Sequence, residues 1–319
     1  MNAAMNTEPS QQIHDLAAVR AQARADKDWA AADAARDAIV ALGWIVTDTA
    51  QGYSLTEKPP FEQFASLGAW TSQQERIVAE SAVVMVLIDG WPADALTCVS
   101  ALRDHAPSGV RILVVDLGDV DGAGNAVHQF AASDPSMCVV HLGQTLAQAG
   151  WGPVVNAAIA VIDAPALVLL DMSTVLDADA ITPLIRALDD HVVATGWKGA
   201  VVDTADQWRT VVDVGHGEVD VLLGYLMAVR TDAARATGPN SKAKFYRNAD
   251  LEWSLALRAA GGKLVVPEAE LPVHQGRHHG YHDSDPAIRD KESKRTYDRI
   301  LATFRGRQDI LSGRAPVLP

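Results

Sequence analysis

Three short apolar runs in this chain end on an aspartate. The runs are SAVVMVLID, RILVVD and PALVLLD, and their last residues are Asp89, Asp116 and Asp171. Short, nearly continuous apolar runs predict strands that are buried on both faces of a sheet. The carboxyl ends of parallel strands meet at one edge, where open α/β folds bind their ligands. Carboxylates there could accept hydrogen bonds from ribose hydroxyls or a base N–H, or hold a divalent cation beside a diphosphate.

Each of these aspartates also has a purely structural interpretation. Asp171 is followed by small polar residues, and on that stretch alone it could cap a loop. Three carboxylates at one sheet edge repel one another unless cations or hydrogen-bond donors offset their charge. The repetition therefore favours a binding site over three separate loop caps.

A further pair of carboxylates, Asp250 and Glu252, lies in RNADLEWSLALRAAGG, which has the pattern of a helix. The helix dipole stabilises an acidic side chain in the first turn, so a capping role explains Asp250 without any chemistry. The alternative is a general base, which must lie within reach of the hydroxyl that it deprotonates. Both interpretations of Asp250 stay open, and Glu252 is the reserve base.

The carboxyl-terminal region is basic and rich in histidine. The stretch HQGRHHGYHD contains His274, Arg277, His278, His279 and His282. Guanidinium and imidazole groups suit a diphosphate or a metal ion. A solvated, flexible tail is the competing interpretation.

The elements that must position these residues alternate between strand and helix from about residue 80. Helical patterns at 92–107, 122–134 and 151–163 separate the apolar runs, and strand-rich sequence follows residue 190. This alternation predicts an α/β fold, Rossmann-like, with a mostly parallel sheet flanked by helices.

The first 60 residues have a different pattern. Residues 11–43 carry apolar positions at helical spacing in two pieces, which predicts a helical hairpin. A short pair of strands follows, with Gln51 and Gly52 at the turn, and EKPP closes the unit because consecutive prolines continue neither helix nor sheet. We therefore expect a helical-hairpin domain at 1–60 and a larger domain at 61–319.

Composition restricts the function classes. The net charge is -13 and 48% of the residues are hydrophobic, as in a soluble globular protein. A protein this acidic is not expected to bind a phosphate backbone as its main partner. No apolar run approaches the length of a membrane helix and no signal pattern begins the chain, so we expect no membrane span and a cytoplasmic location.

Residues 80–275 resemble a GT-A glycosyltransferase of the large family-2-like group that uses nucleotide-diphospho-sugars. RILVVDLGDVDGAGNAV is similar to the nucleoside-binding turn, GWGPVVNAAIAVIDAPALVLLDMS to the segment that ends in Asp-x-Asp, and NADLEWSLALRAAGGKLVVPEAELPVH to the segment that ends in a terminal His. The resemblance implies an enzyme of the hexosyltransferase type, which transfers a sugar from a nucleotide-diphosphate donor to an unidentified acceptor.

The same resemblance implies roles for single residues. It places Asp250 at the position of the catalytic base. It implies that Asp116, Asp121, Asn156 and Asp171 bind the donor, with Ser173 at the third position of Asp-x-Asp. The strand ends and the basic cluster add Asp89 and Arg277 to the expected donor-binding residues. A divalent metal, Mg²⁺ or Mn²⁺, would be held by Asp171 and His274.

This chain departs from the family pattern at four positions. Ser173 replaces the second Asp of Asp-x-Asp, and Val155 stands where a basic residue is common. Ala249 replaces the Glu before Asp250, and Ala256 replaces an Arg. These changes predict a weak or absent metal requirement. They also leave a second hypothesis open, in which the domain is a non-catalytic GT-A-like module that binds a nucleotide or a partner.

The N-terminal segment resembles the carboxyl-terminal appendage of cysteinyl-tRNA synthetases. The similar residues lie in ARADKDWAAADAARDAIVALGWIVTDTAQGYSL. None of the motifs of the aminoacylation site accompanies it, so we expect a docking or oligomerisation hairpin rather than a tRNA-binding domain.

Overall fold

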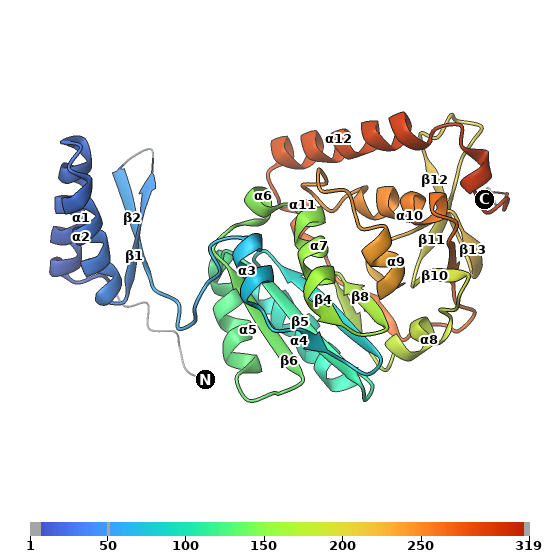
Figure 1. The fold of residues 1–319 in the computed structure, drawn as a ribbon, viewed down its shortest axis with the longest axis horizontal. Coiled ribbons are helices and arrows are strands. Elements are labelled where there is room, and N and C mark those ends of the chain that lie inside the picture. The colour runs from blue at the N-terminus through green and yellow to red at the C-terminus, as the bar shows by residue number, and fades with distance from the viewer. Residues whose placement is uncertain (1–7, 50–51, 316–319) are drawn as a thin grey trace. The chain divides into compact units, whose positions relative to one another are not determined.

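The computed structural model of this protein describes residues 8–49 and 52–315. The chain divides into two compact units, Met1–Glu62 and Gln63–Pro319 (Figure 1). Each unit has its own hydrophobic core.

The first unit is a helical hairpin followed by a strand pair. Its elements are α1 (Gln11–Ala25), α2 (Trp29–Ala41), β1 (Trp44–Thr49) and β2 (Gly52–Glu57). The Asp28 side chain caps α2 by accepting a hydrogen bond from the Ala31 N–H. Ile13, Ala17, Ile39 and Val46 form the buried core. The strands pair antiparallel with Thr49 opposite Gly52, and the expected turn residue Gln51 lies outside the described residues.

An eight-stranded sheet forms the centre of the second unit. Its strand order is β13-β16-β10-β15-β8-β4-β5-β6. The strands are β4 (Ala82–Ile88), β5 (Val110–Leu117), β6 (Met137–Leu142), β8 (Ala166–Leu170), β10 (Val192–Gly196), β13 (Gly217–Val219), β15 (Leu226–Arg230) and β16 (Lys263–Val266). Only β15 and β13 run antiparallel to their neighbours. The expected mostly parallel α/β sheet is confirmed.

Helices cover both faces of this sheet (Figure 1). The helices of this unit are α3 (Leu67–Gln73), α4 (Pro92–His105), α5 (Ala123–Ala131), α6 (Leu146–Ala149), α7 (Trp151–Val161), α8 (Ile181–Arg186), α9 (Thr231–Ala236), α10 (Ala249–Ala259), α11 (His279–His282) and α12 (Pro286–Phe304). Residues of α4, α5 and α8 share a core with one face, and residues of α3, α7, α9 and α10 share a core with the other. Because both faces are buried, the central strands carry apolar residues at nearly every position.

Smaller sheets extend the second unit. They are β12-β11-β14, from Val211–Val214, Gly199–Val202 and Val221–Leu222; β17-β9, from Val273–Gln275 and Thr174–Leu176; and β3-β7, from Ile77–Val78 and Ile162–Asp163. The segment from Lys263 to His274 is apolar at both ends but is not one continuous strand. Strand β16 ends before Pro267, and β17 pairs instead with β9, because proline cannot continue a sheet ladder.

The carboxyl-terminal region forms two helices. The Asp285 side chain caps α12, and Pro286 occupies its first turn, where a missing N–H has no cost. In Figure 1, α12 lies beside α10. No helix within the described residues is long and apolar enough to cross a membrane.

Candidate functional site

A cavity of about 650 Å³ opens where β4 and β8 end. Its wall includes the ends of β4 and β8 with the turns that follow them, and the starts of α4 and α7. The loops before β15 and α10, and α11 with the residues before it, complete the wall. This is the carboxyl edge of the parallel strands, the position at which open α/β folds bind ligands. Among the expected site residues, Asp89, Asp171, Ser173, Asp250 and Arg277 line it.

Asp171 follows β8 and is held by donors on both oxygens. Its Oδ1 accepts hydrogen bonds from the Ser173 N–H at 2.8 Å and the Ser173 hydroxyl at 2.5 Å. Its Oδ2 lies 3.2 Å from His278 Nε2. Burial opposes ionisation of Asp171, but the bonds from His278 and Ser173 outweigh it and hold the pKa of Asp171 below its ordinary value.

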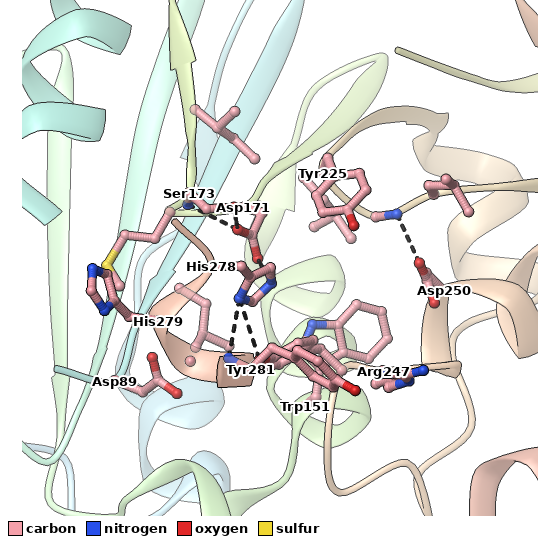
Figure 2. A pocket seen from close by; sticks show the side chains of 18 of the residues that line it. Asp89, Trp151, Asp171, Ser173, Tyr225, Arg247, Asp250, His278, His279 and Tyr281 are labelled. Atoms are coloured by element: carbon pink, nitrogen blue, oxygen red, sulfur yellow. Dashed lines mark hydrogen bonds and ion pairs between the residues drawn. The ribbon is translucent and has the colours of Figure 1, made fainter. Parts of the chain in front are cut away.

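His278 is enclosed by aromatic rings as well as by Asp171. Tyr246 stacks on it at a centroid distance of 4.8 Å, and Tyr225 and Tyr281 meet it edge-on. Its Nδ1 accepts a hydrogen bond from the Tyr281 N–H, which begins α11. Burial lowers the pKa of His278, but the hydrogen bond with Asp171 outweighs burial, so this pKa is raised. Figure 2 shows His278 facing Asp171, with Asp89 and Asp250 on opposite sides of it in this view.

Asp89 follows β4 and lines the same cavity (Figure 2). Burial and the negative charge of Asp171 raise the pKa of Asp89 to about 6. Because β4 and β8 are adjacent and parallel, the two carboxylates arrive at the same edge, as the sequence predicted.

Asp250 lies in the first turn of α10, across the cavity. Its carboxylate accepts hydrogen bonds from the Gly224 N–H at 2.8 Å and the Leu251 N–H at 2.9 Å. A Cβ on Gly224 would lie 3.1 Å from the Asp250 Cβ, so glycine permits this approach. Burial raises the pKa of Asp250 to about 6. This value allows Asp250 to accept a proton near neutral pH.

Asp116 is not brought to the cavity. Side chains alternate along a strand, and Ile112 and Val114 of β5 belong to the core beneath α4 and α5. Asp116 alternates with these residues at every second position, so it points to the same face of the sheet as they do. Asp89 and Asp171 follow the residues of β4 and β8 that point to the other face. Asp116 is fully buried, and its carboxylate lies 2.9 Å from His141 Nδ1. A Cβ on Gly124 would lie 2.1 Å from this carboxylate, so α5 packs directly against it.

Two other expected donor-binding residues also lie outside the cavity wall. Asp121 is exposed on the turn after β5 with φ of 54°. Asn156 projects from α7, and its amide donates to the Pro239 carbonyl at 2.8 Å. Asn156 therefore ties α7 to the loop after α9.

The remaining expected residues are engaged in ion pairs. Glu252 is buried and does not face the cavity. Its carboxylate accepts hydrogen bonds from Arg299 Nε at 2.9 Å and Arg299 Nη2 at 2.8 Å. His274 is exposed and lies 2.9 Å from Asp177. Arg277 lines the cavity mouth and pairs with Asp283 at 2.6 Å. The structure thus pairs Asp171 with His278 rather than with His274.

Several wall residues had no role in the sequence-based prediction. They are Trp151, Tyr225, Tyr246, Arg247 and Tyr281. All except Trp151 lie in loops or the short α11, where polar aromatic residues are a signal of binding. That signal could have been used, but the sequence did not show which loops meet.

Comparison with known proteins shows similarity to one family model in each unit. Residues 83–237 match the family described as Glycosyl transferase family 2, and residues 7–53 match the Cysteinyl-tRNA ligase anticodon binding domain. A similar solved structure is the mannosyltransferase PcManGT from Pyrobaculum calidifontis in complex with GDP-Man and Mn²⁺. The TM-score is 0.51 at 15% identity, covering 73% of this chain and 69% of the other. The fold is that of the GT-A glycosyltransferases.

A second GT-A structure is similar to this chain. GalNAc-T7 with UDP, GalNAc and Mn²⁺ aligns with a TM-score of 0.54 and 13% identity. The match covers 69% of this chain and 48% of GalNAc-T7, so the chain spans about half the length of that protein. At these identities the likeness concerns the fold.

Both of these structures contain Mn²⁺, so we asked whether the side chains around Asp171 could ligate a divalent cation. Ser173 contributes a neutral hydroxyl, which donates to Asp171 Oδ1. His278 occupies the other carboxylate oxygen. Within the part of the chain that the structure describes, no three His, Cys, Asp or Glu side chains converge as a metal site. The residues present therefore do not fit a protein-bound divalent cation.

Proposed function

We propose that this protein is a glycosyltransferase of the hexosyltransferase type that uses a nucleotide-diphospho-sugar. The observation that carries the proposal is the cavity at the carboxyl edge of the sheet, where Asp89, Asp171 and Asp250 converge from three separate elements. The match to glycosyl transferase family 2 supports the same activity. PcManGT and GalNAc-T7, which share the fold, were solved with GDP-Man and with UDP and GalNAc respectively.

Asp250 is the proposed general base. A base in sugar transfer takes the proton of the acceptor hydroxyl as the new glycosidic bond forms. The Asp250 carboxylate is oriented by the Gly224 N–H, and its pKa of about 6 leaves most molecules ionised at neutral pH. Glu252 is not a reserve base in this proposal, because Arg299 holds both of its oxygens.

Asp89 and Asp171 are the proposed hydrogen-bond acceptors for the donor. Asp89 accepts no side-chain bond from another part of the described chain, and it faces the cavity. Hydroxyls of a ribose or a hexose are donors that satisfy such a carboxylate. Asp171 is already fixed by Ser173 and His278, so it would meet the ligand without reorganisation.

Calorimetric titration with UDP, GDP and their hexose conjugates tests this function. We expect one nucleoside diphosphate to bind and to stabilise the fold by about 2.7 kcal/mol at 100 times its dissociation constant. Asp89→Asn is expected to weaken binding, whereas Asp104→Asn on the exposed end of α4 is the matched control. Failure of the wild-type protein to bind any of these ligands would contradict the proposal.

The alternative is a non-catalytic GT-A-like module. The observation that favours it is the pairing of Asp171 with Ser173 and His278, which already uses acceptor positions on both Asp171 oxygens. This alternative predicts that the protein binds a nucleotide but neither transfers sugar to any acceptor nor hydrolyses the nucleotide-sugar. Incubating a radiolabelled nucleotide-sugar with the protein and measuring released sugar separates the two functions.

A further inference from the structure

The cavity wall carries charges of both signs within the described residues. Its carboxylates are Asp89, Asp94, Asp171 and Asp250, and its cationic or titratable basic side chains are Arg247, Arg277, His278, His279 and His282. A diphosphate brings further negative charge into this space. Bound diphosphate therefore requires a cation that is not already neutralised by a carboxylate.

Most of the basic side chains are already paired. Arg277 Nη2 lies 2.6 Å from Asp283, and His279 lies 3.2 Å from Asp94 and 2.5 Å from Asp283. His278 is paired with Asp171. These contacts engage three basic groups with the protein's own carboxylates.

Arg247 differs from these three residues. No carboxylate of the described residues lies within ion-pair distance of it. The nearby Asp290, on which Arg247 acts only through its charge, is already paired with Arg289. Arg247 is exposed at the cavity wall. Its guanidinium carbon lies 4.5 Å from the ring centroid of Tyr281 (Figure 2). A guanidinium stacked on an aromatic ring is held in orientation while its N–H donors remain available at the edge.

The loop that carries Arg247 is fixed on both sides. Asn248 adopts a left-handed backbone with φ of 67°, and its amide donates to the Ser293 carbonyl of α12 at 3.1 Å. Tyr246, on the other side, stacks on His278. Arg247 is thus positioned by neighbours that also shape the cavity.

We propose that Arg247 binds the phosphate groups of the ligand in this cavity. The inference rests on the proposed nucleotide-diphosphate donor, and it follows from the disagreement between the donor set at Asp171 and a divalent cation. A guanidinium forms two parallel hydrogen bonds to phosphate oxygens and keeps its charge at every physiological pH. Arg247 then supplies positive charge to the departing diphosphate.

Calorimetry in the presence of a chelator tests the role of Arg247. The variants are Arg247→Ala, Arg247→Lys and the control Arg295→Ala, which removes one exposed charge from α12. The probes are UDP, GDP, uridine, guanosine and inorganic pyrophosphate. We expect Arg247→Ala to weaken binding of the diphosphates and of pyrophosphate by about 10- to 100-fold and to leave nucleoside binding unchanged.

The other two variants have distinct expected affinities. Arg247→Lys should lie between the wild type and Arg247→Ala, because a lysine retains the charge without the paired hydrogen bonds. Arg295→Ala should bind like the wild type. Equal affinity of Arg247→Ala and the wild type for UDP and GDP would overturn the inference, and so would an equal loss for nucleosides and diphosphates.

Failure of the proposed function is distinguishable from failure of this inference. If the wild-type protein binds neither UDP nor GDP, the proposed donor is wrong, and pyrophosphate alone then decides the role of Arg247. A wild-type protein that does not bind pyrophosphate either would overturn both proposals.

Discussion

The chemistry of the cavity depends on which carboxylates have lost contact with water and which have gained donors. Asp171 has gained donors from Ser173 and His278, so its pKa is lowered although it is buried. Asp89 and Asp250 are half-buried with fewer compensating donors, and the pKa of each is raised to about 6. One cavity therefore holds a carboxyl group with a lowered pKa beside two whose pKa is raised to about 6.

Asp250→Asn tests the base directly. We expect transfer to fall by on the order of 100-fold or more, because the amide accepts no proton. Nucleotide affinity should not change, since the amide oxygen still accepts from the Gly224 N–H. Single-turnover transfer and calorimetric titration measure these two quantities. If Asp250 serves only to cap α10, the variant will instead unfold more easily and turn over normally per folded molecule.

The pH dependence of transfer provides a second test of Asp250. The ionised form is the base, so activity should be full above pH 7 and lost as pH falls through the pKa of about 6. Below that value kcat/KM should fall by about tenfold for each pH unit. Asp89 has a similar pKa, so the nucleotide dissociation constant must be measured over the same range to separate donor binding from proton transfer. A flat profile from pH 5 to 8 would contradict the assignment.

Asp116 is expected to act on stability rather than on ligand binding. Asp116→Asn removes the charge of a fully buried carboxylate that contacts His141, at an expected cost of about 1–3 kcal/mol in the free energy of unfolding. Urea unfolding measures this cost, with Asp104→Asn, an exposed carboxylate, as the control. Reduced nucleotide affinity with unchanged stability would instead support the nucleoside-binding role that the family resemblance implies.

Among the elements, α12 has the clearest supporting role. It follows α11 in sequence, and its Ser293 carbonyl holds the loop that carries Tyr246 and Arg247. Arg299 of α12 reaches across to Glu252 of α10 and forms a two-point ion pair. The basic carboxyl-terminal region is thus partly a packed helix, because its apolar residues, including Ile300 and Phe304, are buried in a core with Leu255 of α10.

Glu252→Gln measures the strength of this connection. The substitution leaves Arg299 without its charge partner, so the free energy of unfolding should fall by about 3 kcal/mol. Lys294→Ala breaks the exposed pair with Asp298 on the same helix and should cost about 0.5 kcal/mol or less. Chemical unfolding of both variants tests the difference. A Glu252→Gln protein of normal stability that has lost transfer would restore Glu252 as a candidate base.

At the scale of the whole molecule, the two units have separate cores. The core of the N-terminal unit is formed by Ile13, Ala17, Ile39 and Val46, and the ion pair from Arg20 to Asp48 fastens α1 to β1. Residues 8–62 contain five Lys and Arg residues. Three of them, Arg20, Arg24 and Arg36, form ion pairs with aspartates. The docking or oligomerisation role expected from the sequence stays a prediction.

Removal of residues 1–62 is expected to leave the GT-A unit folded. Since each unit has its own core, the shortened protein should keep the nucleotide affinity of the full chain within about twofold. Calorimetric unfolding and nucleotide titration of both proteins test this expectation. A shortened protein that fails to fold, or that loses nucleotide affinity, would show that the N-terminal unit completes the larger one.

The sequence by itself determined the α/β class, the positions of the central strands and the convergence of Asp89 and Asp171. These follow from local patterns, because a buried strand ending in an acidic residue can be recognised from its own residues. The resemblance to GT-A enzymes added Asp250, which lies far from Asp171 in the chain.

Only the tertiary structure decided that Asp116 faces the opposite side of the sheet. Both faces are apolar, so the sequence pattern of β5 does not indicate which face a side chain joins. The tertiary structure also decided that His278 pairs with Asp171 and that Arg299 pairs with Glu252. It likewise placed Arg247 over the ring of Tyr281. These contacts join distant segments, and no local sequence pattern specifies them.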